Sequence, residues 1–275
     1  MTKAGLATAG LLAILLARPA LGDVVRGQAL DELALDYHVY AGGFHALSLE
    51  TRVSLGPEAY AVKFKARSDG FLDSLLGFTL DAEAIGRAAA AGLTPLAFRT
   101  ANRWRSSGER LVEMTYGEDG LPETRTEPPA EADDRDPVPD SLRRGTLDPI
   151  TAMLSLVHGL ARDGRCAGRV PVFDGRRRFD LAARDLGEQD LAPSGVARFA
   201  GLARRCRVTF EPVTGFWRDE RWERPKTSDI EVFLASVVPG GPPVPVRLEA
   251  QNAFGAVRIH LVSAGPAEQE QAPPQ

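Results

Sequence analysis

The sequence predicts a mainly β protein: an antiparallel meander curved into an open or partial β-barrel, with one clear α-helix. Two observations predict the strands. Apolar side chains recur at every second position along much of the chain, and glycine-containing turn dipeptides separate these runs. A third observation predicts the helix, because the apolar spacing changes to three and four residues near 149–162.

The N-terminal half contains the first strands of the meander. Residues 31–54 read as a hairpin, since Leu35, Tyr37 and Val39 alternate with polar residues and Gly42-Gly43 accepts the positive φ of a tight turn. Further alternating runs are expected at 60–66, 96–98 and 112–116. Between the first two of these, residues 71–76 have the spacing of one helical turn, so we expect a short helix or a bend there.

The character of the chain changes at residues 122–146, which contain five prolines and seven acidic residues. Such a stretch buries little apolar surface, so we expect a mobile surface loop inserted in the sheet. The helix follows directly. Asp148 suits the N-cap, Pro149 suits the first helical position, and Gly164 is a plausible stop.

The second half returns to strands. Val170 and Val172 alternate into the turn dipeptide Asp174-Gly175, and 176–181 form the return arm of a hairpin. More strands are expected at 197–213, 230–234, 244–250 and 257–262. We therefore expect a single β-rich domain over residues 23–263, and a disordered polar tail at 264–275.

The first 22 residues have the three parts of a secretory signal peptide. Lys3 gives a positive end, residues 5–17 are apolar, and Ala20-Leu21-Gly22 provides small residues before a cut at Asp23. The alternative is an uncleaved anchor, but the run is shorter than the about 20 residues of a membrane span. No later segment is apolar enough to cross a bilayer. The expected mature protein is therefore soluble and periplasmic, without a stable transmembrane segment.

Charge argues against nucleic acid as a partner, because the chain of 275 residues has a formal net charge of −4. Residues 162–224 are nevertheless rich in arginine. This basic region could meet an anionic envelope polymer or a phosphorylated lipid. The plainer interpretation is a solvated face whose arginines pair with nearby acids.

Cys166 and Cys206 are the two cysteines of the sequence. An exported chain with one pair favours a disulfide, since oxidising compartments keep such bonds. The bond would close a loop of about 40 residues and would stabilise the fold rather than perform chemistry.

Candidate ligand-binding residues lie inside and just after this cysteine bracket. Arg176 and Arg178 share one strand face, and paired guanidiniums suit a carboxylate or a phosphate. Trp217 and Trp222 lie among charges, a pattern that forms either a sugar- or lipid-facing rim or a plug at the end of a sheet. For the arginines, the alternative is ion pairing with Asp174, Asp180 or other acids of the sheet.

Catalytic, metal and cofactor motifs are not found in the sequence. The four histidines have no ligand spacing such as His-Glu-x-x-His, although His38 and His45 flank the first turn and could meet across the hairpin. There is no nucleophile elbow, phosphate-binding glycine loop or dinucleotide fingerprint. We therefore expect no catalytic residue, no metal and no cofactor. Whether the protein is an enzyme stays open, although the absence of these motifs favours a protein that is not an enzyme.

Several short motifs are distinctive. They are Leu147-Asp148-Pro149, the stretch from Pro171 to Leu181, Cys206-Arg207-Val208 with Pro212 and Gly215, Pro245-Val246-Arg247, and the early Tyr37 to Gly43 hairpin with Leu93-Thr94-Pro95. Together these motifs resemble one bacterial family, Domain of Unknown Function 3108. The most specific part is Asp174-Gly175 with the three arginines that follow. The resemblance implies a secreted, β-rich envelope protein without an established activity.

Three functions stay open from the sequence. The first is a non-catalytic binding or assembly factor that holds a lipid or an envelope polymer in the hollow of the sheet. The second is a hydrolase of envelope glycans that uses concave-face carboxylates, with a tryptophan as sugar platform. The third is a structural partner that docks another envelope protein through a sheet edge or the basic region.

Overall fold

The structure, a computed structural model, describes residues 32–130, 134–218, 228–252 and 255–267. The strands are β1 (Glu32–Ala41), β2 (Phe44–Leu55), β3 (Ala59–Ser68), β4 (Thr79–Ala89), β5 (Gly92–Trp104), β6 (Gly108–Tyr116), β7 (Pro122–Glu127), β8 (Ala167–Phe173), β9 (Arg178–Leu191), β10 (Gly201–Thr214), β11 (Ser228–Ser236), β12 (Pro243–Asn252) and β13 (Gly255–Pro266). The helices are α1 (Gly70–Leu76), α2 (Asp140–Arg143) and α3 (Pro149–Asp163). The predicted signal peptide lies outside the described residues.

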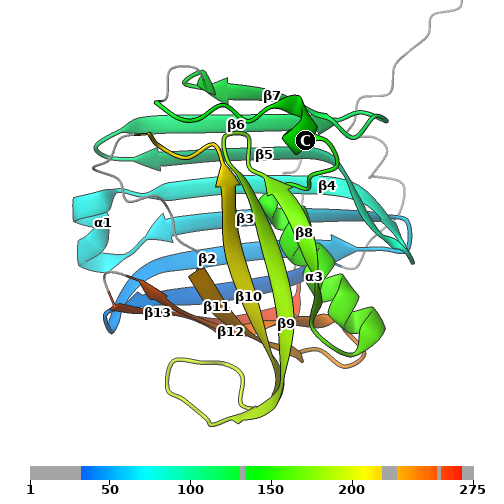
Figure 1. Ribbon diagram of the computed structural model, residues 1–275. Helices are drawn as coiled ribbons and strands as arrows, with labels where there is room; N and C mark the ends of the chain where they lie inside the picture. Colours follow the sequence, from blue (N-terminus) through cyan, green and yellow to red (C-terminus); the bar gives the residue numbers. More distant parts are fainter. Residues whose placement is uncertain (1–31, 131–133, 219–227, 253–254, 268–275) are drawn as a thin grey trace, which may run out of the picture.

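All the strands of the described part form one antiparallel sheet in the order β7-β6-β5-β4-β3-β2-β1-β13-β12-β11-β10-β9-β8. Strands that are consecutive in sequence therefore pair with each other, except that β7 does not pair with β8, and β1 pairs with β13 as well as with β2. The sheet curls round so that β8–β10 lie in front of β3–β6 (Figure 1), but β7 and β8 do not pair with each other and stay its two edge strands. The end of β8 is bridged by Leu147, which pairs with Val172. This confirms the predicted mainly β class and the open barrel.

Helix α3 packs on the concave side of the sheet, between the two facing walls (Figure 1). Its residues Leu156 and Leu160 belong to a buried cluster with Cys206 and Val232. Its first turn, through Ile150, packs against a second cluster on β3–β6. The helix thus fills the space between the walls, and its predicted start after Asp148 and stop at Gly164 are confirmed.

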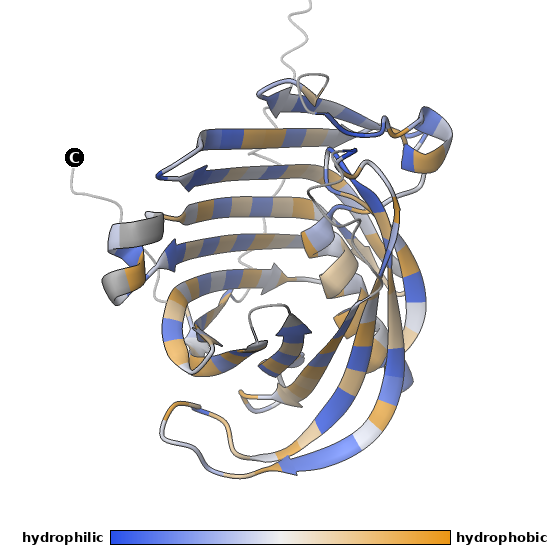
Figure 2. Cartoon of the chain, turned by 60° about the vertical axis from the view of Figure 1, so that its left-hand side comes forward, coloured by the Kyte–Doolittle hydropathy of each residue, from blue (hydrophilic) through white to orange (hydrophobic). Residues whose placement is uncertain are grey.

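Most strands have one buried and one polar face. In Figure 2 the strands are striped by hydropathy, which is the two-residue alternation seen in the sequence. On β3, for example, Tyr60, Val62 and Ala66 are buried while Lys63 and Lys65 are exposed. The outer face of the sheet is therefore rich in charge.

The structure corrects three expectations about the extent of strands. Strand β4 was not expected, because its inward residues are small alanines such as Ala84, which has little strand propensity but packs fully buried in the β3–β6 cluster. Residues 122–127, expected in the mobile loop, form β7, which pairs with β6 along one edge only. Residues 264–266, expected in the tail, extend β13, because Leu33 of β1 pairs with Pro266.

Candidate functional site

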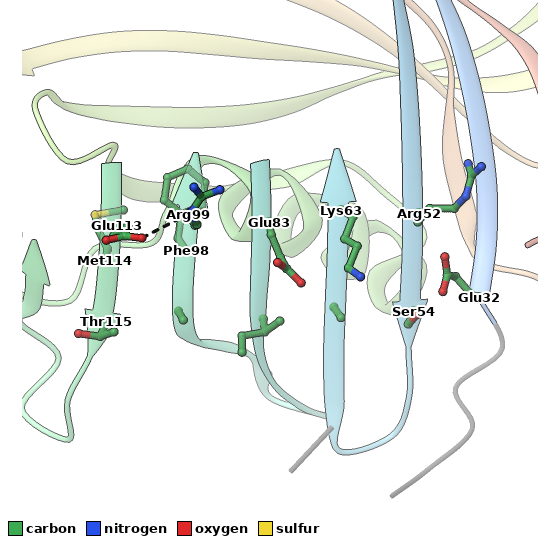
Figure 3. A pocket seen from close by; sticks show the side chains of 13 residues that line it. Glu32, Arg52, Ser54, Lys63, Glu83, Phe98, Arg99, Glu113, Met114 and Thr115 are labelled. Atoms are coloured by element: carbon green, nitrogen blue, oxygen red, sulfur yellow. Dashed lines mark ion pairs between the residues drawn. The ribbon is translucent and has the colours of Figure 1, made fainter. Parts of the chain in front are cut away.

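A trough of about 620 Å³ crosses the outer face of β1–β6. Its floor is low because mostly small side chains stand in one row across neighbouring strands. They are Ser54, Ala61 and Ala97, with the larger Ile85 of β4 between the two alanines. Long charged side chains form its wall (Figure 3). Apart from Phe98 and Met114, which also belong to the buried cluster, the trough residues alternate along each strand with core residues such as Val62 and Ala84, so the trough opens on the face away from α3.

The wall of the trough is a row of charged residues that stand directly opposite one another in register. In order across β2 to β7 the row is Arg52, Lys63, Glu83, Arg99, Glu113 and Arg125. Neighbouring strands lie about 4.8 Å apart, so the trough from β1 to β6 is about 24 Å long. The signs alternate over most of this length, which favours pairing between neighbours.

Ion pairs engage both ends of the row. Glu113 lies 3.4 Å from Arg99 and 3.4 Å from Arg125. At the other end Arg52 lies 3.6 Å from Asp36. These charges are compensated within the sheet.

The centre of the row is different. Lys63 and Glu83 stand opposite each other on β3 and β4 and are both exposed. Neither makes an ion pair or a side-chain hydrogen bond with any residue that the structure describes. One ammonium donor and one carboxylate acceptor therefore stand side by side in the trough, available to a ligand.

The arginines predicted as ligand contacts make contacts within the protein. The side chain of Arg178 is 12% exposed, pairs with Asp180, and donates to the carbonyl of Leu142 before α3. The guanidinium of Arg176 donates to the carbonyl of Pro128. Both arginines thus tie the β8–β9 hairpin to the segment between β7 and α3.

The turn between β8 and β9 is held by Asp174, whose carboxylate accepts the backbone N–H groups of Arg176 at 3.0 Å and Arg177 at 2.7 Å. Gly215 lies against this turn with φ +86°. A Cβ at residue 215 would lie 2.2 Å from the carbonyl oxygen of Arg176. Glycine is therefore required there for both conformation and space.

Replacing Gly215 by alanine should destabilise the fold more than replacing Gly240 by alanine. Gly240 also has a positive φ (+71°), but a Cβ added there would have no neighbouring atom within 4 Å. Both variants strain the backbone, but the alanine Cβ at position 215 also collides with the turn between β8 and β9. We expect its free energy of unfolding to fall by about 1–3 kcal/mol more than that of Gly240→Ala, measured by urea denaturation. Equal losses in the two variants would contradict the close approach.

Trp217 stacks on an arginine rather than lining the trough. The guanidinium carbon of Arg135 lies 3.9 Å from the centre of the indole, and the two residues form a β-bridge. Trp222, and the neighbouring acids Asp219 and Glu220, lie outside the described residues.

Cys166 and Cys206 form the predicted disulfide, with their Cα atoms 5.8 Å apart. Both are buried in the cluster below α3. The backbone N–H of Cys166 also donates to Asp185 on β9 at 2.9 Å. The bond therefore pins the chain between α3 and β8 to β10, as expected.

The histidines are more closely grouped than their sequence positions indicate. His38 and His45 do meet across the first hairpin, with ring centres 4.2 Å apart. His260 joins them because β13 pairs with β1, which no local signal reveals. Within the described ranges, no three His, Cys, Asp or Glu side chains are grouped closely enough to hold a metal ion.

Beside the start of α3 lies a buried polar group. Asp148 is fully buried and accepts the backbone N–H groups of Ile150 at 3.0 Å and Thr151 at 2.9 Å. Its second oxygen has no hydrogen-bond partner among the described residues. Burial raises the pKa of this carboxyl to about 6, although the hydrogen bonds from Thr151 and Ile150 oppose the rise.

Fold and site together define an open, antiparallel β-sheet protein with one disulfide, an internal helix and a charged outer trough. The chain belongs to the family described as Protein of unknown function (DUF3108), whose model matches residues 36–262. This confirms the resemblance found in the sequence motifs.

The comparisons with other proteins add little beyond the family. A solved structure, a β-barrel-like protein of Domain of Unknown Function DUF1849 from Brucella abortus, is similar at 14% identity and a TM-score of 0.47. The match covers 87% of this chain and 98% of that one. No curated protein matches the sequence.

Proposed function

We propose that this protein is a non-catalytic binding or assembly factor of the bacterial envelope that holds an envelope polymer in the trough. The observation that carries the proposal is the unpaired Lys63 and Glu83 at the centre of an otherwise compensated row of charges. If this face of the sheet served only solubility, nothing would require a continuous hollow beneath such a pair of charges.

The position of the trough favours a polymer over a lipid. The concave side, where the sequence led us to expect the ligand, holds α3 and buried apolar clusters. The trough instead lies outside, is open, and has charged walls with a narrow apolar floor, which suits an extended polar chain better than an acyl chain.

The two free charges define the chemistry of the ligand. The ammonium of Lys63 suits a carboxylate of the ligand, and the carboxylate of Glu83 suits an amino group. We infer an amphoteric polymer, with amino and carboxyl groups on one chain. The arginines and acids on either side already neutralise one another, so they give no net attraction to a ligand with a strong charge of one sign. They therefore favour a ligand of mixed charge.

The competing functions have less support. The expected hydrolase would use two carboxylates on the concave face, but that side of the sheet holds α3 and buried apolar clusters. In the trough, Glu113 forms ion pairs with Arg99 and Arg125. Docking of another protein through a sheet edge is the remaining alternative, and the exposed strands β7 and β8 would provide the edge.

An envelope location fits the disulfide, because a bonded cysteine pair is typical of an oxidising compartment. No helix in the described part of the chain is both long and apolar enough to span a membrane. The periplasm and the cleaved signal peptide are part of this proposal.

The test is a binding assay with soluble peptidoglycan fragments, which have amino and carboxyl groups on one chain. Isothermal titration calorimetry should detect binding that weakens with salt. The variant Lys63→Gln/Glu83→Gln should bind about tenfold more weakly, because two charge-assisted contacts are lost at an exposed site.

The matched control is Lys65→Gln/Asp81→Asn, which removes the next opposed pair on the same two strands, outside the trough lining. It should bind like the unmodified protein. Dextran, poly-glutamate and phosphatidylglycerol vesicles serve as neutral, anionic and lipid probes. Binding to vesicles but not to the fragments would favour the lipid ligand, and equal loss in both variants would overturn the trough as the site.

A further inference from the structure

Three of the four histidines in the sequence gather on the outer face of β2, β1 and β13. His38 stands directly opposite His260 across β1 and β13. The ring centre of His38 is 4.2 Å from that of His45. The ring centre of Tyr40 is 5.4 Å from that of His45 and 5.9 Å from that of His260. We call these four residues, His38, Tyr40, His45 and His260, the histidine cluster.

The cluster spans the joint of the sheet. Because β1 pairs with β13, strands β1–β7 and strands β8–β13 are hydrogen-bonded to each other only along this one pair among the described strands. The β1–β13 pairing also contains a register shift between Asp36 and Tyr37. We call this pairing the seam. A change in the side chains that cross the seam therefore acts where the two parts of the sheet meet.

His260 is poorly placed to become charged. It is 9% exposed, and its Nδ1 is buried without a hydrogen-bond partner among the described residues. Arg247 stands directly opposite it on β12, and Arg258 is two residues away on β13. Burial, and then the two guanidiniums, lower the pKa of His260, against a smaller opposite effect of Glu249.

His38 also favours its neutral form. Burial and the neighbouring His45 lower its pKa, while Asp69 and Asp36 act in the opposite sense. His45 has an acidic neighbour of its own, since its Nε2 lies 3.7 Å from the carboxylate of Asp69. That carboxylate also accepts a hydrogen bond from Ser48. Acid would therefore place positive charges on His38 and His260, which stand directly opposite each other across β1 and β13.

Other charged groups surround the cluster on every strand that borders it. They are Asp36 on β1, Glu50 on β2, Arg67 on β3, Asp69 before α1, Arg247 and Glu249 on β12, and Arg258 on β13. Several of these are already paired, for example Arg67 with Glu50 at 3.2 Å and Arg247 with Glu249 at 3.2 Å. The acids are thus partly committed to arginines and compensate new imidazolium charges only in part.

We propose that the histidine cluster makes the seam sensitive to acid, so that protonation of His38 and His260 loosens the pairing of β1 with β13. The direction follows from linkage. A histidine with a lowered pKa in the folded state binds its proton more readily once the seam opens. The stability that the neutral rings contribute is present above the ordinary pKa of about 6.5 and is lost as the pH falls below it.

The experiment is amide hydrogen exchange at pH 7.5 and pH 5.0, corrected for the intrinsic exchange rates. The opening constant of seam amides should rise about two- to fivefold on acidification, the effect expected of like charges placed opposite each other on neighbouring strands. Strands far from the seam, such as β5, should not share the increase. The variant His38→Gln/His260→Gln, which cannot be charged, should lose it.

The control variant is His158→Gln, which changes the one histidine outside the cluster, on α3. It should respond to acid like the unmodified protein. If the double variant does not fold, NMR titration of the unmodified protein decides: His38 and His260 should titrate below the ordinary histidine pKa of about 6.5. Titration of both at or above that value, or acid-induced opening that is uniform across the sheet, would overturn the proposal.

Discussion

Replacing Cys166 and Cys206 together by alanine is expected to lower the free energy of unfolding by roughly 4 kcal/mol. The two residues are 40 apart in sequence, and the bond restricts a loop of that length in the unfolded chain. The loop contains all of β8 and β9, so the unrestricted chain has more entropy to lose on folding. Both sulfurs are buried below α3, so a small packing loss adds to this.

Urea denaturation with and without reductant measures the effect. The unmodified protein should lose about as much stability on reduction as the double variant loses without reductant. The double variant itself should not respond to reductant, which makes it its own control. An unchanged urea midpoint after verified reduction of the unmodified protein would contradict the proposed stabilising role.

The second large effect concerns the buried carboxyl of Asp148. Its pKa is raised by burial from 3.8 to about 6, so the folded state holds a proton that the unfolded state releases. The stability this proton contributes is fully present below about pH 3.8 and is lost as the pH rises through 6. The loss amounts to roughly 3 kcal/mol, given about 1.4 kcal/mol for each pKa unit.

The variant Asp148→Asn should remove this pH dependence. The amide oxygen of asparagine still accepts the N–H groups of Ile150 and Thr151, but the side chain never charges. Relative to the unmodified protein, the variant should therefore gain roughly 3 kcal/mol between pH 4 and pH 7.5. The variant Asp148→Ala should lack the pH dependence as well, but it should be about 2 kcal/mol less stable than Asp148→Asn at both values, because two helix N–H groups lose their acceptor.

Urea denaturation at four pH values between 4 and 7.5 separates these outcomes. The exposed Asp140, at the start of α2, supplies a control as Asp140→Asn, which should follow the unmodified protein. If Asp148→Asn and the unmodified protein change in parallel with pH, the carboxyl of Asp148 does not titrate in a buried site.

Sequence reasoning was most successful where the determining contacts are local. The start of α3 follows from Asp148 and Pro149, which cap and open a helix within four residues. The hairpin at Gly42-Gly43 follows from two residues that accept positive φ, as both do here. The disulfide followed from a count and a compartment, and its Cα separation of 5.8 Å confirms the pairing.

Sequence reasoning failed where a strand is defined by its neighbours. Ala84 is a weak strand former, yet it is fully buried between Val62 of β3 and Phe98 of β5. Strand β7 was hidden by prolines and charges, which an edge strand tolerates because only one side must pair. A central strand with the same composition would be much less stable.

The trough could not be predicted for the same reason. Lys63, Glu83 and Arg99 are separated by 20 and 16 residues in the chain and have no motif in common. They form a row because the turns between β3, β4 and β5 set a register that places them opposite one another. Arg176 and Arg178, which do form a motif, were more visible in the sequence.

By itself, the sequence determined the class of fold, the helix with its ends, the first and last hairpins, the cysteine pair and the family. Local periodicity, capping and turn chemistry are sufficient for these, because each acts over a few residues. Only the tertiary structure decided that β1 joins β13, that His260 therefore stands opposite His38, and that opposed charges line one trough. Such contacts depend on the register between distant strands, and register is set by the packing of the whole sheet.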